Sequence, residues 1–233
     1  MPVAVTSTIT STGLVSSAAM VIPTGALADD ILVLSVLTRS SAALSVVEDS
    51  GAAWTEKARH DNTASMSVWW RRAATDPSGS TVHVNGGANS LVAAMVSFSG
   101  CVTSGDPWSD FESTIASGTS NASMTAVTAD SSGAGVVLFA GEGDDRALST
   151  MTAGGTPSSL ARIAHPIHSI GLDAALVVGF NSMASSGNTG TFTWSWAAAV
   201  QHRSHAGVLA PVGGAPPPVE NPNWLGFALM GVQ

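Results

Sequence analysis

The chain has 233 residues, of which 45% are hydrophobic and 10% are charged, so it can bury a substantial core. Acidic residues outnumber basic ones by 16 to 8, which gives a formal net charge of −8. Proteins that bind nucleic acid need clustered Lys and Arg to displace counterions from phosphates, so this balance argues against a nucleic-acid partner. The single cysteine, Cys101, excludes an intramolecular disulfide and a cysteine-based zinc site, and we expect it to be a small buried hydrophobe.

The N-terminus and the hydrophobic runs bear on location. Residues 1–6 have neither the basic start nor the continuous apolar stretch of a secretory signal. No run approaches the roughly 18 apolar residues of a membrane span. We therefore expect synthesis in the cytoplasm and no membrane partner, and a protein that acted outside the cell would have to leave in an assembly or by lysis.

The predicted elements are all strands. Short runs rich in Val, Ile, Thr, Ala and Trp alternate with Gly, Ser, Asn, Asp and Pro about every ten residues, which is typical of an antiparallel sandwich or barrel. Phe192, Trp194 and Trp196 alternate with hydroxyl residues and share one face, which favours core packing. Trp69 and Trp70 should point to opposite faces. In chain order, the clearest predicted strands are residues 31–37, 65–71, 81–84, 91–98, 135–140, 174–180, 191–196 and 205–209.

The order of these features recurs along the chain. Two halves, about 7–102 and 113–212, share one predicted strand order. A period of about 100 residues is too long for a solenoid, which favours duplication of a half-sandwich or of a small domain. The paired segments are 7–10 with 113–116, 18–22 with 122–126, 31–37 with 136–140, 58–60 with 163–165, 66–70 with 173–178, 81–84 with 191–194 and 91–98 with 205–209.

We expect residues 1–212 to form one antiparallel β-sandwich, jelly-roll-like, of roughly ten to twelve strands built from the two sequence-similar halves. The connection at 103–112 is short and contains Trp108 and Phe111, whereas a free interdomain linker would be polar and flexible. Two tandem immunoglobulin-sized domains are the alternative.

The composition changes near the end of the chain. Residues 213–233 form a Pro-rich linker and an apolar C-terminal tail, and the proline run favours an extended conformation. An apolar end beyond a stiff spacer should not stay in water, so either it folds back as an edge strand or it docks on another subunit. The candidate assembly interface consists of its large apolar side chains, Trp224, Leu225, Phe227, Leu229 and Met230.

Residues that could carry catalysis or hold a metal are few. His165 and His168, and likewise His202 and His205, lie three apart, which in a strand places them on opposite faces and disfavours a shared metal. The acidic run at 142–145 lacks the spacing of an EF-hand and favours a solvated hairpin tip. No nucleophile elbow, phosphate loop or zinc-protease motif occurs. We predict no catalytic residue, no cofactor and no metal.

Four segments carry a further pattern. They are DILVLSV at 30–36, GAAWT at 51–55, VWWRRA at 68–73 and SFSG at 97–100. Together they resemble a β-sandwich module of tailed-phage virion structural proteins, also found in some bacterial surface proteins. That module usually has a GD-LVL strand, a GWT turn, a YYK or WWR strand and a closing FSG strand.

The resemblance covers most of residues 25–212 and departs from the pattern at two places. Asp29-Asp30 stands in place of Gly-Asp, and Ala53 in place of the glycine before Trp54. The resemblance implies a structural or adhesive role and supplies no catalytic residues.

The leading hypothesis is a non-enzymatic structural component of a tailed-phage or phage-like virion, either a capsid decoration protein or a tail-associated protein. Its partners would be other virion proteins and further copies of itself. A second hypothesis is a glycan-binding module or adhesin that stacks exposed tryptophans on host-surface sugars, since the chain has seven Trp and no Tyr. The third is a glycoside-active enzyme on a sandwich scaffold, with two carboxylates in a groove.

Overall fold

The computed structural model describes residues 1–14, 17–61, 64–75, 77–86, 90–144, 148–169 and 173–213. Every regular element in these ranges is a β-strand, and every strand pairing is antiparallel. The all-β, antiparallel prediction is therefore confirmed. These ranges contain no helix that could cross a membrane.

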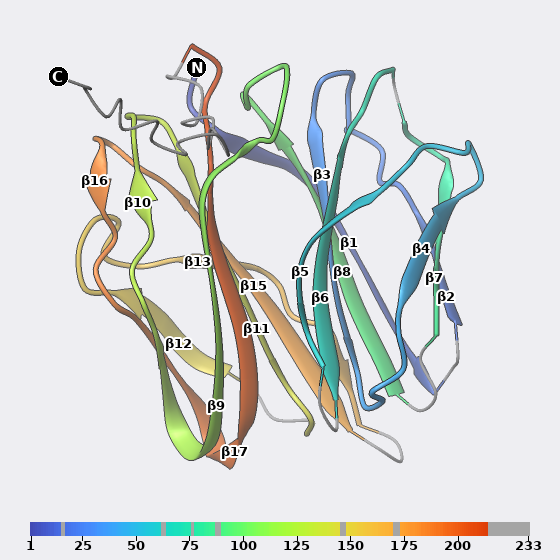
Figure 1. The fold of residues 1–233 in the computed structure, drawn as a ribbon, viewed down its shortest axis with the longest axis vertical. Coiled ribbons are helices and arrows are strands. Elements are labelled where there is room, and N and C mark those ends of the chain that lie inside the picture. The colour runs from blue at the N-terminus through green and yellow to red at the C-terminus, as the bar shows by residue number, and fades with distance from the viewer. Residues whose placement is uncertain are drawn as a thin grey trace, which may run out of the picture.

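The first half of the chain forms a large sheet and a small one (Figure 1). The large sheet has the strand order β1 (Ala4–Leu14), β8 (Ser90–Ser99), β3 (Ile31–Thr38), β6 (Ser65–Arg72) and β5 (Thr55–His60). The small sheet has the order β2 (Ser17–Val21), β7 (Thr81–Asn85) and β4 (Ser45–Glu48).

The second half forms one large sheet around a long strand, β17 (Phe192–Leu209). Its last part pairs with β11 and with the start of β9, and its first part pairs with β12 and with the end of β9. The other strands are β9 (Trp108–Met124), β10 (Thr128–Ala129), β11 (Gly135–Glu142), β12 (Leu148–Ala153), β13 (Ala161–Ala164), β14 (Ile167–His168), β15 (Ala174–Ser182) and β16 (Gly187–Asn188). Of these, β13 and β14 pair with β15, and β10 pairs with β16.

The strand orders of the two halves correspond. The order β1-β8-β3-β6-β5 has its counterpart in β9-β17-β11-β15-β13. The central strands agree in register as well, because Ser35 pairs with Ala94 as Phe139 pairs with His205.

This register shifts one predicted correspondence. Thr10 pairs with Ala94 and Ser113 pairs with His205, so residue 10 corresponds to residue 113. The predicted pairing of residues 7–10 with 113–116 is therefore wrong by three positions.

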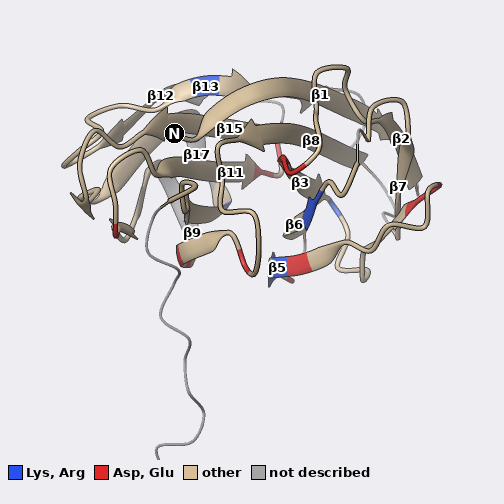
Figure 2. Cartoon of the chain, turned by 90° about the horizontal axis from the view of Figure 1, so that it is seen from above, with Lys and Arg blue, Asp and Glu red and all other residues tan. Residues whose placement is uncertain are grey.

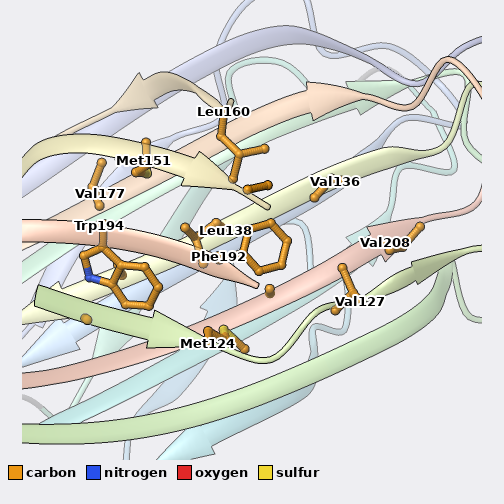
Figure 3. Close-up of a cluster of buried hydrophobic side chains, with 14 of the residues drawn as sticks. Met124, Val127, Val136, Leu138, Met151, Leu160, Val177, Phe192, Trp194 and Val208 are labelled. Carbon is orange, nitrogen blue, oxygen red and sulfur yellow. The ribbon is translucent and has the colours of Figure 1, made fainter. Parts of the chain in front are cut away.

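Three buried clusters fill the space between the sheets. One lies within each half, and Figure 3 shows the one in the second half, where Phe192 and Trp194 of β17 face Leu138 of β11. The third cluster lies between the two large sheets and draws Val33 and Val96 from the first half and Phe139 from the second. The two large sheets therefore pack face to face, with β15 against β8 and β3, and β17 against β6.

The connection between the halves is held to the sandwich. Arg72 donates to the carbonyl oxygens of Val102 and Gly105, and Lys57 Nζ lies 2.8 Å from Asp106 Oδ2. Trp108 then enters the central cluster with 3% of its surface exposed.

All eight predicted strand segments are strands in the structure, although 191–196 and 205–209 belong to the single strand β17. Trp69 packs against the first-half cluster and Trp70 against the central one, as their alternation predicts. Phe192, Trp194 and Trp196 share the second-half cluster, and Cys101 is buried. The tail, residues 214–233, lies outside the described residues.

Candidate functional site

The predicted assembly residues Trp224, Leu225, Phe227, Leu229 and Met230 lie outside the described residues. Within the described ranges, no group of three or more His, Cys, Asp or Glu side chains gathers in a way that could hold a metal ion. We first consider two places that bring polar side chains together, one between the large sheets and one on the outer face of the second half.

The first place is the polar junction, formed by His60, Ser113, Arg203 and His205, where β5 and β17 meet between the halves. The rings of His60 and His205 stack at 4.5 Å between centroids, with 13° between their planes. His205 Nδ1 lies 2.8 Å from the hydroxyl oxygen of Ser113 on β9, and Arg203 donates to Gln201 Oε1 at 2.6 Å.

Burial controls the protonation of the polar junction. Burial, with a smaller contribution from the charge on His60, lowers the pKa of His205 to about 3, so His205 is neutral in the folded chain at ordinary pH. Burial also lowers the pKa of His60. The pKa of Arg203 is lowered by burial and by the like charge of Arg39.

The polar junction is poorly suited to nucleophilic catalysis. Ser113 is exposed and bonded to a histidine, but a serine nucleophile needs a base whose pKa lies near neutral and a third group that orients it. Here the pKa of His205 is near 3, and its ring stacks on His60. The arrangement therefore favours a structural contact between the halves.

The structure also places His202 and the first residue of the acidic run. His202 and His205 lie on opposite faces of β17, because His202 stacks near Trp196 while His205 faces the first half. Glu142 ends β11 and is fully buried, so the prediction of a solvated hairpin tip is wrong at this residue. Sequence alternation alone did not show that this end of β11 is covered.

The second place is a hollow of about 390 Å³ on the outer face of the second half. Neutral hydroxyl and amide groups of β9, β12 and β17 line it, and Thr152 Oγ1 lies 2.7 Å from Thr193 Oγ1. Its lining contains no charged side chain and no exposed aromatic ring, since Trp194 is 3% exposed. Such a surface can form hydrogen bonds but has no acid or base for chemistry.

Tryptophan exposure bears on the glycan hypothesis. Sugar stacking needs an accessible indole face. Of the six tryptophans in the described part of the chain, Trp108, Trp194 and Trp196 are buried and the other three are half-buried. No exposed indole is therefore available in these ranges.

All three half-buried tryptophans belong to the segments that carry the family resemblance, and the contacts of Trp54 connect two of these segments. Trp54 Nε1 donates to Glu48 Oε2 at 3.0 Å, and the Arg71 guanidinium lies 5.6 Å from the centre of a Trp54 ring. Arg71 and Glu48 form an ion pair at 2.6 Å, with side chains 7% and 1% exposed. Sequence reasoning did not identify Glu48, because nothing in its local pattern distinguishes it.

A second set of contacts joins the other two segments. The buried carboxylate of Asp30, immediately before β3, accepts a hydrogen bond from Ser97 Oγ at 2.8 Å and one from the Leu27 N–H at 3.1 Å. The four segments at 30–36, 51–55, 68–73 and 97–100 are therefore tied pairwise by buried polar contacts. These buried polar side chains hold strands of the first half together.

Comparisons with protein-family models, with curated proteins and with solved structures give no match to this chain.

Proposed function

We propose that this chain is a non-enzymatic structural component of a tailed-phage or phage-like virion, either a capsid decoration protein or a tail-associated protein. The observation that carries the proposal is the pairwise connection of the four resemblance segments, through Asp30 with Ser97 and through Glu48 with Trp54 and Arg71. A pattern whose residues maintain a sandwich, and not a reaction, fits a protein that works through its surfaces.

The architecture supports two finer parts of the proposal. We propose that the sandwich is jelly-roll-like, and the first half supports this, since the order β1-β8-β3-β6 belongs to one sheet and β2-β7-β4 to the other. The halves arose by duplication, a proposal supported by the matching strand orders and by the shared register of β3 and β11. A β-bulge after Val5 in β1 has a counterpart after Trp108 in β9.

The C-terminal tail is proposed to anchor the chain in its assembly. Its point of departure is fixed, because the Val212 N–H donates to the Gly100 carbonyl at 2.7 Å and Pro211 forms a bridge with Cys101. Beyond this point the sequence supplies a stiff Pro-rich spacer and the apolar side chains Trp224, Phe227 and Leu229. Such a tail can reach a neighbouring subunit without disturbing the sandwich.

The first experiment asks whether the chain belongs to particles. Particles released from the producing culture are banded in a density gradient, washed in high salt and quantified by mass spectrometry. We expect the chain to band with particles at a constant copy number relative to the major shell or tail protein. Recovery among free soluble proteins alone would refute the structural role.

The second experiment tests the anchor. A chain lacking residues 219–233 is compared with a full-length chain in which Trp224, Phe227 and Leu229 are replaced by serine. We expect both variants to keep the wild-type melting temperature and to be missing from particles. Normal incorporation of both would remove the anchoring role while leaving particle membership intact.

The alternatives make their own predictions in the same samples. Glycan binding predicts a sugar affinity that falls when a half-buried tryptophan such as Trp54 or Trp69 is replaced by a residue that preserves folding. A glycoside-active enzyme predicts hydrolysis that depends on a pair of carboxylates. Either result, together with absence from particles, would replace the structural proposal.

A further inference from the structure

The first strand, β1, is an edge strand with an unused side. It is 11 residues long and pairs with β8 on one side, and no other strand in the described ranges pairs with its second side. Natural proteins usually protect such an edge with charged side chains, proline or a covering segment, because a row of free N–H and C=O groups can pair with another chain.

The backbone hydrogen bonds show which residues face this free side. The Arg39 N–H donates to Ser90 O at 3.1 Å, and the Ala73 N–H donates to Asp30 O at 2.9 Å. Odd-numbered residues of β3 therefore bond to β8, and even-numbered ones bond to β6, since bonding alternates along an antiparallel strand.

The same alternation carries across β8 to β1. Even-numbered residues of β8 bond to β3, so the odd-numbered ones, such as Met95 and Ala93, bond to their β1 partners Ile9 and Ser11. Consequently Thr8, Thr10 and Thr12 direct their N–H and C=O groups outward.

The sequence of this edge is symmetric and uncharged. Residues 6–12 read Thr-Ser-Thr-Ile-Thr-Ser-Thr, a palindrome centred on Ile9, which is also the midpoint of β1. No Asp, Glu, Lys or Arg side chain precedes Asp29, and β1 contains no proline. Figure 2 shows β1 in tan, the colour of residues other than Lys, Arg, Asp and Glu. The corresponding edge strand, β9, carries Asp110 and Glu112.

We propose that β1 is a self-association strand, to which the β1 strand of a second copy of this chain adds antiparallel about a two-fold axis at Ile9. In this register Thr8 pairs with Thr10 of the second copy, and Thr10 with Thr8 of the second copy. Both are outward-facing residues, so each pair exchanges two backbone hydrogen bonds. The first-half large sheets of the two copies then form one continuous sheet.

Self-complementarity identifies the occupant as a second copy. Antiparallel pairing about Ile9 matches each residue from 7 to 11, within the regular register of β1, with a residue of the same type, which gives cross-strand Thr–Thr and Ser–Ser pairs. The net charge of −8 opposes contact between copies in general, and β1 is a neutral stretch where that repulsion is weak. This association does not depend on the virion role.

The register is tested by disulfide trapping in a Cys101→Ala background. At the axis, Ile9 faces Ile9 of the second copy as a non-hydrogen-bonded pair with Cα atoms about 4.5 Å apart, which a disulfide can span. Ser11 of the two copies would lie four residues apart along the strands, about 13 Å. We expect Ile9→Cys to form a disulfide-linked dimer under mild oxidation and the matched variant Ser11→Cys to stay monomeric. Equal crosslinking of both variants, or none of either, would overturn the proposal.

The association itself is tested by sedimentation equilibrium of the full chain. Thr10→Pro removes one outward N–H that makes no bond within the sheet, whereas the matched variant Thr10→Val keeps it. We expect wild type and Thr10→Val to be dimeric and Thr10→Pro to be monomeric, with melting temperatures of all three close together. A monomeric wild type would overturn the proposal, and if removal of residues 214–233 then produced a dimer, the occupant of the edge would be this chain's own tail.

Discussion

Replacement of Glu48 tests how the first half is held together. Glu48 accepts from Arg71 Nη2 at 2.8 Å, from Ser50 Oγ at 2.6 Å and from Trp54 Nε1 at 3.0 Å. Arg71 Nε also lies 2.6 Å from the carboxylate, off the line of a hydrogen bond, so that contact is an ion pair. All of these interactions lie beside the first-half cluster.

Glu48→Ala leaves the Arg71 guanidinium buried, with 7% of its side chain exposed and its counter-charge gone. Removing one partner of a buried pair typically costs about 3–5 kcal/mol, because the remaining charge is not solvated. The loss of the acceptor for Trp54 adds about 1 kcal/mol. We therefore expect the free energy of unfolding to fall by about 4–6 kcal/mol.

The assay is urea denaturation followed by tryptophan fluorescence, with the slope of the transition checked for constancy. The matched control is the double variant Glu48→Leu with Arg71→Met, which removes both charges and fills similar volume. The double variant should lower the free energy of unfolding far less than Glu48→Ala does, since a buried ion pair can be replaced by apolar groups with little net loss of stability. A loss below about 1 kcal/mol for Glu48→Ala, or a double variant as unstable as the single one, would refute the reasoning.

Three further predictions concern the contact between the halves. In the unfolded chain His205 becomes protonated as the pH falls below its ordinary pKa of 6.5, whereas in the folded chain, where its pKa is about 3, it stays neutral until the pH is near 3. Stability should therefore fall by about 2 kcal/mol between pH 6.5 and about 5 in urea titrations, and His205→Phe should reduce that fall. A side chain at Gly141 would meet Leu37 Cδ2 at 3.1 Å across the halves, so Gly141→Val should lower stability by about 1–3 kcal/mol in the same assay, and Leu37→Ala should restore part of the loss. Burial raises the thiol pKa of Cys101 to about 12, so it should resist Ellman's reagent at mildly alkaline pH in the native chain and react fully after denaturation.

The sequence predicts the buried strands well and the edge strands poorly. β3 is buried on both faces, so a continuous apolar run identifies it. β1 was not predicted, because its Ser and Thr residues give no apolar alternation and it is held by backbone pairing with β8. β17 was predicted as two strands, 191–196 and 205–209, yet its pairing with β9 and β11 includes His202 and Arg203 between them.

The polar contacts were less accessible from the sequence. Periodicity shows which residues share a face, but it does not show which faces meet. Glu48 and Arg71 are 23 residues apart, and Ser113 and His205 are 92 apart, so their contacts depend on the sheet order. The alternation of Trp69 and Trp70 was predictable because it is set within one strand.

The faces by which the two large sheets pack on each other differ in side-chain size and charge, and these differences are complementary. In the shared register, Val92 and Ala94 of the first half correspond to Arg203 and His205 of the second. Gly141 of the second half leaves room for Leu37 of the first, whereas its counterpart in the first half is Leu37 itself. If the inner faces of two first halves packed together, Leu37 would meet Leu37 where no glycine leaves room for it. If the inner faces of two second halves packed together, two like-charged Arg203 side chains would be buried together. Side-chain volume and charge at one end of the interface therefore favour pairing of the unlike halves within one chain.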